Sequence, residues 1–531
     1  MGFITIFMTS CETDLIEKPL AVIDPSGYYK NYAEFQTALN GAYAYASNEN
    51  AWGEDMFLIF NSGTDEVVMR NEVTEACYVG VYSVSPNNSA MYGDVYKTFY
   101  QAIGAANYIL EALDGADLTT EERDIVEGQA LFYRAWCHLQ LSTLFGGIVI
   151  ADKAQMPTSV PRSSIEEVFT GLIIPDMIKA KDLLPDTEYE PNRPNKPVVE
   201  AFLAWVYNYL GTAKVQGMGD ILWAESPINS FEWVNASEYH AEALQYSTVV
   251  IQAIGSTLNK SLVSEYDYLF RFNTKETQQQ EFLWTAPSTE FGEQLIHRMI
   301  QFGLPKGSRN RGGGQNKHRP TLEAYQRYDD RDIRKNHNIV FQQDPNASNI
   351  EIVNGLPYYG VKPAKSNGIN SVGKYRYVDP AVTSLPNGAG LIDVAYMRLA
   401  EVYLIHAEAL YFNGRETDAR AALEPLRLRA AGNDVVVAAD LTVAYYRQDF
   451  IQELLDERSR EFFIEGKRRL DLFRFGYERY ETAIYGIDQT ASSQNSLMRF
   501  TTDNYNSKRI WGPISTTEIG VNSELQQNPG Y

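Results

Sequence analysis

The chain has 531 residues, a hydrophobic content of 44% and a formal net charge of −22 at pH 7. This length and apolar content allow a large buried core, in one extended architecture or in several domains. The strong negative charge argues against nucleic acid as a partner, because phosphate binding requires a basic surface. Neutral ligands, cationic ligands and proteins remain as candidate partners.

The N-terminus holds a short apolar run from Phe3 to Met8, followed by Thr9, Ser10 and Cys11. The run is too short to span a bilayer and has the length of a signal-peptide core. Together with the acidic residues that follow, it resembles a bacterial lipoprotein signal in which Cys11 is acylated. No Lys or Arg precedes the run, and the alternative is an ordinary strand with a buried cysteine.

Six stretches in the first half of the chain have apolar residues at helical spacing. They are Ala33–Ala46, Tyr96–Asp117, Thr119–Gly147, Arg162–Pro185, Lys196–Gly211 and Asn235–Gly255. Thr119 or Thr120 precedes an acidic first turn, which the helix dipole favours. Ser163 or Ser164 opens the fourth stretch with a capping-box pattern. These stretches predict long helices joined by elaborate loops.

Between about Glu265 and Asp393 the pattern changes, because Gly, Asn and Pro become common and helical periodicity weakens. Runs such as Gln280–Pro287 and Gly373–Asp379 predict short strands. An insert of this length on a helical frame is predicted to carry function. Its basic segment Gly303–Pro320 predicts a surface loop, with contact to an anionic ligand or a partner protein as the alternative.

Helical periodicity resumes from about Tyr396 to Tyr485, with small and large residues alternating at a fixed spacing: Ala407, Leu410, Gly414 and Ala419. The first half of that spacing recurs at Ala204, Tyr207 and Gly211. Small residues let two helices approach closely and Gly permits the tight turn, as in tetratricopeptide-type helix pairs. We therefore predict a mainly α fold, a tetratricopeptide-like α–α superhelix with loop-rich insertions and a few short strands. The helical frame is expected at about 30–255 and 394–485, and the insert at about 265–393.

Carboxylates alternate with arginines between Glu457 and Asp471. A glycosidase would need two carboxylates that flank a sugar, one of them protonated, and neighbouring arginines keep carboxylates ionised. The pattern favours a salt-bridge network over an active site. The six histidines show no metal or triad grouping, and no catalytic motif is present. We therefore expect no catalytic residue, no metal site and no cofactor.

Several blocks of the chain together resemble the SusD/RagB family, in the expected order and over nearly the whole length. They are EGQALFYRAWCHLQLSTLFGGIVI (127–150), YMRLAEVYLIHAEALYFNG (396–414), ALEPLRLRAAG (422–432), LLDERSREFFIEGKRRLDLFRFG (454–476) and RIWGPISTTEIGVNSELQQNPGY (509–531). Two further blocks, Arg162–Pro185 and RPTLEAYQRYDDRDIR (319–334), are similar to the family as well.

This resemblance implies an outer-membrane lipoprotein of Bacteroidota that faces the outside of the cell and is not an enzyme. It implies binding of oligosaccharides, or in some branches of peptides and glycoproteins, and delivery to a SusC-like TonB-dependent transporter. Acidic residues after Cys11 look like the surface-export signal of such lipoproteins. The implied organisation is a leader and linker in residues 1–20, attached to the membrane through lipid, and a single SusD-like domain in residues 21–531.

Sugar recognition requires aromatic rings together with amide, carboxylate or guanidinium groups on loops. Two early loop regions and the insert supply them, and the predicted ligand-binding residues are Trp52, Asn61, Asp65, Tyr78, Tyr82, Asn88, Tyr92, Phe302 and Arg309. The alternative is that these rings fill the core, as we expect for Trp136, Trp205 and Trp284.

The sequence therefore predicts a surface protein that captures a glycan and passes it to a transporter. Three alternatives remain: the same architecture binding peptides or glycoproteins, a glycosidase on a helical scaffold, and a tetratricopeptide adaptor inside the cell.

Overall fold

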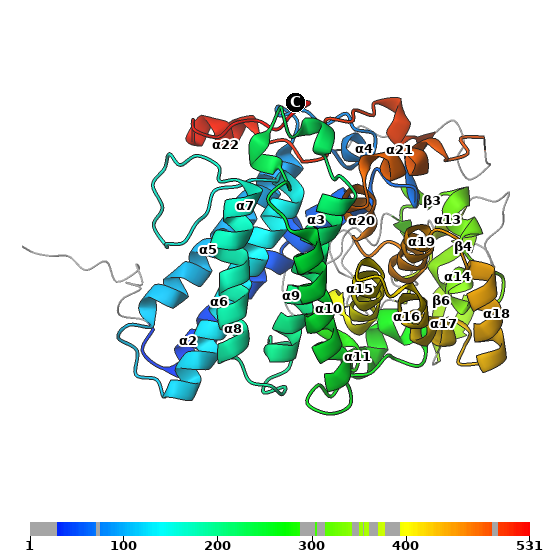
Figure 1. The fold of residues 1–531 in the computed structure, drawn as a ribbon, viewed down its shortest axis with the longest axis horizontal. Helices are drawn as coiled ribbons and strands as arrows, with labels where there is room; N and C mark the ends of the chain where they lie inside the picture. Colours follow the sequence, from blue (N-terminus) through cyan, green and yellow to red (C-terminus); the bar gives the residue numbers. More distant parts are fainter. Residues whose placement is uncertain are drawn as a thin grey trace, which may run out of the picture.

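The computed structural model describes residues 29–70, 75–286, 303–304, 314–341, 350–353, 355–359, 370–377, 393–490 and 498–531. Most of these residues form helices, which confirms the predicted fold class (Figure 1). The long helices fall in the two stretches expected for the frame. The division into a leader and one domain stays a prediction, since residues 1–28 lie outside the described part.

Long antiparallel helices build the N-terminal half, each packed against its neighbours in the sequence (Figure 1). They are α2 (Tyr32–Ser47), α5 (Ala90–Ala112), α6 (Thr120–Phe145), α8 (Ile174–Leu183), α9 (Lys196–Val215) and α10 (Ala236–Ala253). Shorter helices connect them: η1 (Glu49–Gly53), α3 (Asp55–Asn61), α4 (Glu75–Gly80), α7 (Ile165–Val168), η2 (Phe169–Ile173), η3 (Asp220–Leu222) and η4 (Pro227–Asn229).

Local sequence sets where these helices begin and end. Ser164 forms the predicted capping box with Glu167, and Thr119, one of the two predicted N-caps, forms a capping box with Glu122. Such caps satisfy backbone N–H groups that have no partner inside the helix. At the other end of α6, Gly146 has φ +78°, a left-handed conformation that disfavours a side chain.

The C-terminal half continues the helical frame. Its helices are α15 (Leu399–Phe412), α16 (Glu416–Ala421), α17 (Glu424–Ala430), α18 (Val435–Tyr445), α19 (Phe450–Phe462), α20 (Arg468–Arg474), α21 (Tyr477–Tyr485), η8 (Thr501–Asp503) and α22 (Thr516–Val521). Gly414, with φ +76°, turns α15 into α16, and Ala407 and Ala419 are buried where the two helices meet. The predicted helix pair is therefore confirmed.

The close approach of two helices also explains why a glycine, Gly211, occupies its position in the other copy of the spacing, Ala204, Tyr207 and Gly211. A Cβ at this position would lie 2.8 Å from the ring of His240, which α10 brings against α9. Because α10 packs in turn against α15, the two copies of the spacing belong to one continuous stack of helices.

The region between the two helical halves contributes short helices and strands. The helices are η5 (Tyr266–Phe270), η6 (Phe272–Thr274), α11 (Lys275–Gln278), α13 (Leu322–Gln326) and α14 (Ile333–Asn338). The antiparallel ladders are β3–β1–β9 (His318–Pro320, Val67–Arg70 and Met498–Arg499), β2–β8 (Phe282–Ala286 and Val394–Arg398), β4–β7 (Ile339–Phe341 and Asn370–Val372) and β5–β6 (Ile350–Val353 and Leu356–Tyr359).

Two sequence predictions about this region need correction. The described part of Gly373–Asp379 is a turn with a single bridge at Tyr377, because Arg376 folds back and donates hydrogen bonds to the carbonyls of His337 and Gly373. The end of the basic segment, His318 to Pro320, is a buried strand paired with β1 and not a surface loop. The strand predicted within Gln280–Pro287 is confirmed as β2.

Aromatic rings fill the core between the two halves. Trp136 and Trp284, both predicted to be core residues, are buried and meet edge to face with their ring centroids 4.8 Å apart. Burial of rings of this size dominates the apolar stabilisation of such a core. Trp205 lies at the edge of the same cluster and keeps part of its surface accessible.

Buried ion pairs join the C-terminal helices to the rest of the fold. The Nη1 atom of Arg398 lies 2.9 Å from Glu281 Oε1 and 2.6 Å from Glu461 Oε1. Arg334 Nη1 lies 2.8 Å from carboxylate oxygens of both Glu457 and Glu461. The network predicted from the charge pattern therefore exists, but many of its partners come from other elements and not from neighbours along the same helix.

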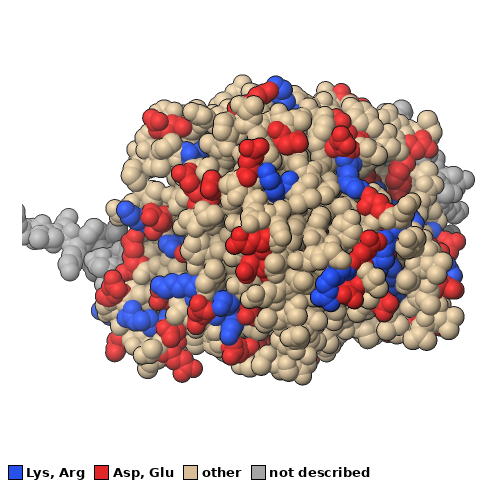
Figure 2. Space-filling view, viewed as in Figure 1, with Lys and Arg blue, Asp and Glu red and all other residues tan. Residues whose placement is uncertain are grey.

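Charges on the outer surface are intermixed. Figure 2 shows acidic and basic side chains side by side on one face, separated by uncharged stretches. None of the helices that the structure describes combines the length and the apolar character needed to cross a membrane.

Candidate ligand-binding site

An open pocket with a volume of about 620 Å³ lies between the loop after α4, helix α21 and the loop after η8. Helices α4 and α21 mark its place at the upper edge of the molecule in Figure 1. We call it the tyrosine pocket; its lining residues are Tyr82, Ser83, Val84, Ser85, Glu481, Asn504, Tyr505, Asn506, Ser507 and Arg509. The volume is typical of sites that bind small ligands.

The wall formed by residues 82–88 is held in an unusual conformation. Tyr82 has φ +56°, a left-handed backbone that costs a bulky residue about 1 kcal/mol or more. Arg509 donates hydrogen bonds to the carbonyls of Tyr82 and Val84, and Asn88 Oδ1 accepts one of 3.0 Å from Ser85 Oγ. Strain that is held in this way is frequently found at binding sites.

Two tyrosines stand at the apolar part of the pocket, of which Tyr505 is half-buried and Tyr82 is buried, at 4% exposure. The rings of Tyr82 and Tyr505 meet edge to face with centroids 5.4 Å apart, and the exposed Tyr485 meets Tyr505 in the same way at 6.0 Å. Burial raises the pKa of both Tyr82 and Tyr505, so their phenols stay neutral at physiological pH. A neutral ring carries an apolar face with a polar tip, which suits wet, stacking recognition.

Polar groups surround these rings. Asn504, Asn506 and Ser507 supply amide and hydroxyl groups on the loop that carries Tyr505. On α21, Glu481 Oε1 accepts a hydrogen bond of 2.7 Å from Tyr477 Oη. Amides, hydroxyls and a carboxylate around aromatic rings can bind a ligand that has many hydroxyl groups and weakly polar C–H faces.

Two other cavities fit a ligand less well. A crevice of about 460 Å³ between α13, α19, α20 and α21 has no aromatic ring in its lining, and its Asp65, Arg327 and Arg468 are already paired with one another. A slot of about 50 Å³ beside Trp52 has space for a few water molecules only. In the described part of the chain, no cluster of three or more His, Cys, Asp or Glu side chains is arranged to hold a metal ion.

Of the predicted ligand-binding residues, Tyr82 lines the pocket and Asn88 secures its wall. Tyr78 lies on α4 just before the wall, where its carbonyl accepts a hydrogen bond from the Ser83 backbone. Tyr92 differs, because it is buried on α5 against Phe145 and the backbone of Gly512. It therefore supports the pocket from behind and does not line it.

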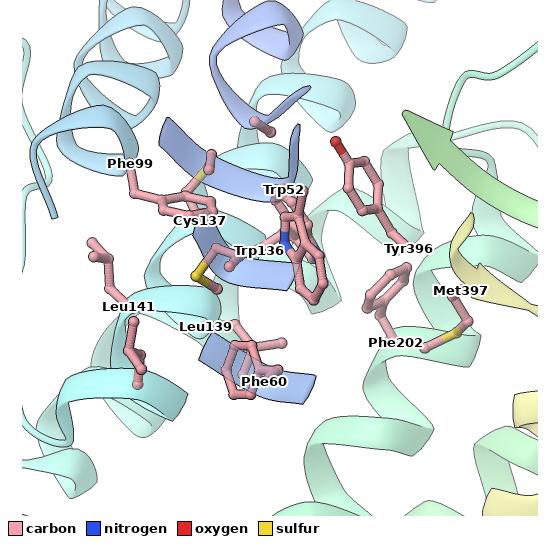
Figure 3. Packing of buried hydrophobic residues seen from close by; sticks show 14 of the residues in the cluster. Trp52, Phe60, Phe99, Trp136, Cys137, Leu139, Leu141, Phe202, Tyr396 and Met397 are labelled. Atoms are coloured by element: carbon pink, nitrogen blue, oxygen red, sulfur yellow. The ribbon is translucent and has the colours of Figure 1, made fainter. Parts of the chain in front are cut away.

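The first predicted region does not form part of the pocket. Trp52 lies in the core beside Phe60 and Tyr396 (Figure 3), is 8% exposed, and donates a hydrogen bond of 3.1 Å to Gln140 Oε1. Asn61 is buried as well. Its amide nitrogen donates a hydrogen bond to the Phe57 carbonyl, and its amide oxygen accepts one from the Gly466 N–H. The physical reason is that helix α3 is apolar and lies in the interior. Asn61, its last residue, and Trp52, which precedes it, are therefore buried as well.

Asp65 is buried too, at 2% exposure, and both its oxygens lie 2.7 Å from the guanidinium of Arg468. Arg327 pairs with the same carboxylate. Burial alone would raise the pKa of Asp65, but these two arginines hold it well below its usual range. The carboxylate is thus committed to a structural ion pair.

Phe302, Arg309 and Cys11 lie outside the described residues, so their roles stay predictions. Tyr505 and its neighbours were not among the predicted residues, although Asn504 and Asn506 flank this ring in the same combination of aromatic and amide side chains that is found in the early loops. Arg509 was also missed. Nothing in the local sequence shows that its side chain reaches the loop after α4.

In the part of the chain that the structure describes, the fold is a helical-repeat frame that carries an open pocket of ligand size beside two tyrosines. The chain belongs to the SusD family, whose model matches residues 209–531. A second model, described as "Starch-binding associating with outer membrane", matches residues 25–208. These matches confirm the resemblance to the SusD/RagB family.

Individual proteins agree with this assignment. The chain is 25% identical to "SusD-like protein P2" of Formosa agariphila, over 100% of this chain and 99% of that protein. A crystal structure of a SusD homolog from Bacteroides thetaiotaomicron has a TM-score of 0.72 at 19% identity, covering 96% of this chain and 98% of that one. A structure described as a laminarin-binding SusD-like protein has a TM-score of 0.66 at 19% identity, covering 95% and 100%.

Proposed function

We propose that the protein binds oligosaccharides in the tyrosine pocket, outside the cell, and delivers them to a SusC-like TonB-dependent transporter. Membership of the SusD family supports this proposal, as does the second matching model, whose description names starch binding and the outer membrane. The description of one structural relative as laminarin-binding is consistent with a glycan ligand.

The observation that carries the proposal is the combination of tyrosine rings and hydrogen-bonding groups in an open pocket. Tyr505, which is half-buried and meets the buried Tyr82 edge to face, offers ring surface to the C–H faces of a sugar, and the side chains of Asn504, Asn506 and Ser507 can bond its hydroxyl groups. Each such contact contributes modestly, so several together set the affinity.

We infer binding without turnover. Hydrolysis of a glycosidic bond requires two carboxylates on either side of it, and Glu481 is the one carboxylate among the lining residues of the pocket. The conspicuous carboxylates of α19 are buried in the core. Burial would raise the pKa of Glu461, but Arg429, Arg398 and Arg334 hold it well below its usual range, which is unsuitable for a general acid.

Attachment to the membrane is proposed through a lipid on Cys11. This inference rests on the sequence around Cys11 and on the family, because the N-terminal segment lies outside the described residues. Metabolic labelling with an alkyne fatty acid tests it: label should appear in the full-length chain and disappear in Cys11→Ser. Label that persists in the Cys11→Ser chain would contradict the assignment of Cys11.

A comparison of glycan and peptide ligands tests the binding function. Isothermal titration calorimetry of the full chain against neutral and anionic oligosaccharides and against a pool of peptides should give binding to oligosaccharides alone. Saturable binding to peptides, with none to any oligosaccharide, would overturn the proposal in favour of the peptide-binding alternative. Release of shorter sugars during a long incubation would overturn the inference of binding without turnover.

A further inference from the structure

Two arginines beside the tyrosine pocket, the buried Arg469 and the half-buried Arg509, differ from most buried arginines of the protein. Six arginines of the core each lie within ion-pair distance of at least one carboxylate: Arg334, Arg398, Arg429, Arg458, Arg468 and Arg474. Arg469 and Arg509 pair with no carboxylate among the described residues; aromatic rings and backbone carbonyls surround them.

Arg469 lies behind the ring of Tyr82. Its side chain is buried, and its guanidinium carbon is 5.2 Å from the centre of that ring. The groups around it are the phenols of Tyr82, Tyr92, Tyr480 and Tyr531, which are neutral at physiological pH. A buried cation without a counterion is unfavourable, and its field is poorly screened. That field favours negative charge in the adjoining pocket.

Arg509 lines the pocket itself. Its Nε donates to the carbonyl of Gly530 at 3.0 Å, and its Nη1 donates to the carbonyls of Tyr82 and Val84. These bonds, together with the Tyr531 ring 4.8 Å from the guanidinium carbon, fix the guanidinium plane, and none of them uses Nη2. A fixed, planar guanidinium is well suited to a carboxylate or sulfate group, because little side-chain entropy is lost on binding.

Glu481 is the one charge of opposite sign among the lining residues, and Tyr477 holds it at the α21 side of the pocket. Among the lining residues the charges of Arg509 and Glu481 balance, and Arg469 behind Tyr82 adds one further positive charge to the surroundings of the pocket, in a chain whose net charge is −22. Local charge acts more strongly on a bound ligand than distant surface charge, which salt screens beyond about 10 Å.

We propose that the tyrosine pocket binds anionic saccharides, with the carboxylate or sulfate group of the sugar at Arg509 and within the field of Arg469. This ligand class rests on the oligosaccharide-binding function proposed above and narrows it. Carboxylated and sulfated sugars share the chemistry that the site recognises, and the experiment distinguishes them.

Calorimetry with the full chain compares three matched sets of probes: neutral galactose oligosaccharides, galacturonate oligosaccharides and sulfated galactose oligosaccharides of the same length. We expect at least one anionic set to bind about tenfold or more tightly than the neutral set. That preference should shrink several-fold as salt rises from about 0.05 M to about 0.5 M. Whichever anionic set binds more tightly identifies the group.

Variants connect the preference to the site. Arg509→Gln should reduce the affinity for the preferred anionic set about tenfold, and Arg509→Lys should fall between that variant and the wild type because the charge remains and the planar fork is lost. Lys508→Gln is the matched control. It removes a neighbouring positive charge that pairs with Glu225 outside the pocket, so we expect less than a twofold change.

The outcomes separate this inference from the function on which it rests. Neutral probes that bind as tightly as both anionic sets would overturn the anionic preference and leave oligosaccharide binding in place. No binding of any set would overturn both. Circular dichroism would reveal misfolding of Arg509→Gln. The comparison of probes with the wild-type protein, and its salt dependence, need no variant, so they test the proposal even if that variant misfolds.

Discussion

The rings of Tyr82 and Tyr505 meet edge to face with their centroids 5.4 Å apart, although one follows α4 and the other follows η8 near the end of the chain. Tyr82 is fixed by its left-handed backbone and by Arg509, whereas Tyr505 is half-buried on a polar loop. This contact places both tyrosines at the same pocket. Because Tyr505 is the more accessible of the two, its substitution should affect ligand binding more than folding.

Replacement of Tyr505 should weaken ligand binding without unfolding the protein. Tyr505→Ala removes one ring from the pocket, and we expect the affinity for the bound oligosaccharide to fall about tenfold, since one aromatic contact contributes on the order of 1 kcal/mol. Calorimetry measures the loss and thermal unfolding checks the fold. Tyr446→Ala, an exposed tyrosine next to α18, is the matched control and should bind normally. Equal affinities in both variants would remove Tyr505 from the site.

Trp52 should behave as a core residue. The sequence alone suggests that Trp52→Ala weakens glycan binding without unfolding, but the ring is buried beside Phe60 and Tyr396. We now expect Trp52→Ala to lower the free energy of unfolding by about 3–5 kcal/mol, as truncation of a buried tryptophan does. Urea denaturation measures this loss. A variant of normal stability and reduced affinity would restore Trp52 to the binding site.

Substitution of Arg398 should cause one of the largest losses in the free energy of unfolding. Arg398→Met would leave Glu281, Glu461 and Glu465 buried near one another with fewer counterions. Breaking a buried ion pair in this way costs about 3–5 kcal/mol. Denaturant unfolding compares it with Lys508→Ala, whose exposed pair with Glu225 contributes less than about 1 kcal/mol. Similar losses in the two variants would contradict the role assigned to the buried network.

Stability should decline in mild acid partly through His138. Its Nδ1–H donates to the Arg134 carbonyl and its Nε2 accepts from the Ala151 N–H, so the folded protein requires the neutral ring. Burial lowers the pKa of His138 to about 4. In the unfolded chain the ring takes up a proton near pH 6.5, so this contribution is fully present above pH 6.5 and is lost as pH falls towards about 4.

The contribution of His138 corresponds to about 3 kcal/mol over that pH range. Unfolding free energies measured from pH 7 to pH 4 should decline less steeply in His138→Gln than in the wild type, although the variant is less stable at pH 7. His240 and His318 also have lowered pKa values, so some slope should remain. An NMR titration of His138 with a midpoint near 6.5 would contradict this account.

Alanine substitutions at two glycines in long helices should change stability in opposite directions. At Gly211 a Cβ would lie 2.8 Å from the ring of His240, so we expect Gly211→Ala to cost about 1–3 kcal/mol of stability. At Gly104, on α5, a Cβ meets nothing within 4 Å. Gly104→Ala should therefore stabilise the protein by about 0.5–1 kcal/mol, because glycine is unfavourable in a helix interior. Thermal denaturation measures both, and a stabilising Gly211→Ala would refute the close approach of α9 and α10.

Much of the fold follows from local sequence. The periodicity of Thr119–Gly147 predicts α6, which begins after Thr119, one of the two predicted N-caps, and ends before Gly146. The spacing of Ala407, Leu410 and Gly414 predicts the α15–α16 pair. Such features succeed because caps, turns and helical faces depend on residues a few positions apart, which one segment of sequence contains.

The site could not be predicted in the same way. An aromatic residue next to asparagines has the same local signature whether its ring is buried or displayed, so Trp52 and Tyr82 looked equally suitable. In the fold both rings are buried, but Tyr82 is among the lining residues of the tyrosine pocket, whereas Trp52 packs against Phe60 and Tyr396 away from it. The charge pattern of α19 likewise predicts a network, while its partners Arg334 and Arg398 come from distant segments.

By itself, the sequence determined the helical class, some of the helix ends and the family resemblance, because these depend on short-range patterns and ordered motifs. Only the tertiary structure decided which rings line a pocket and which arginines lack a carboxylate. Burial and ion pairing are relations between residues far apart in the chain, and the amino-acid order specifies them only through the completed fold.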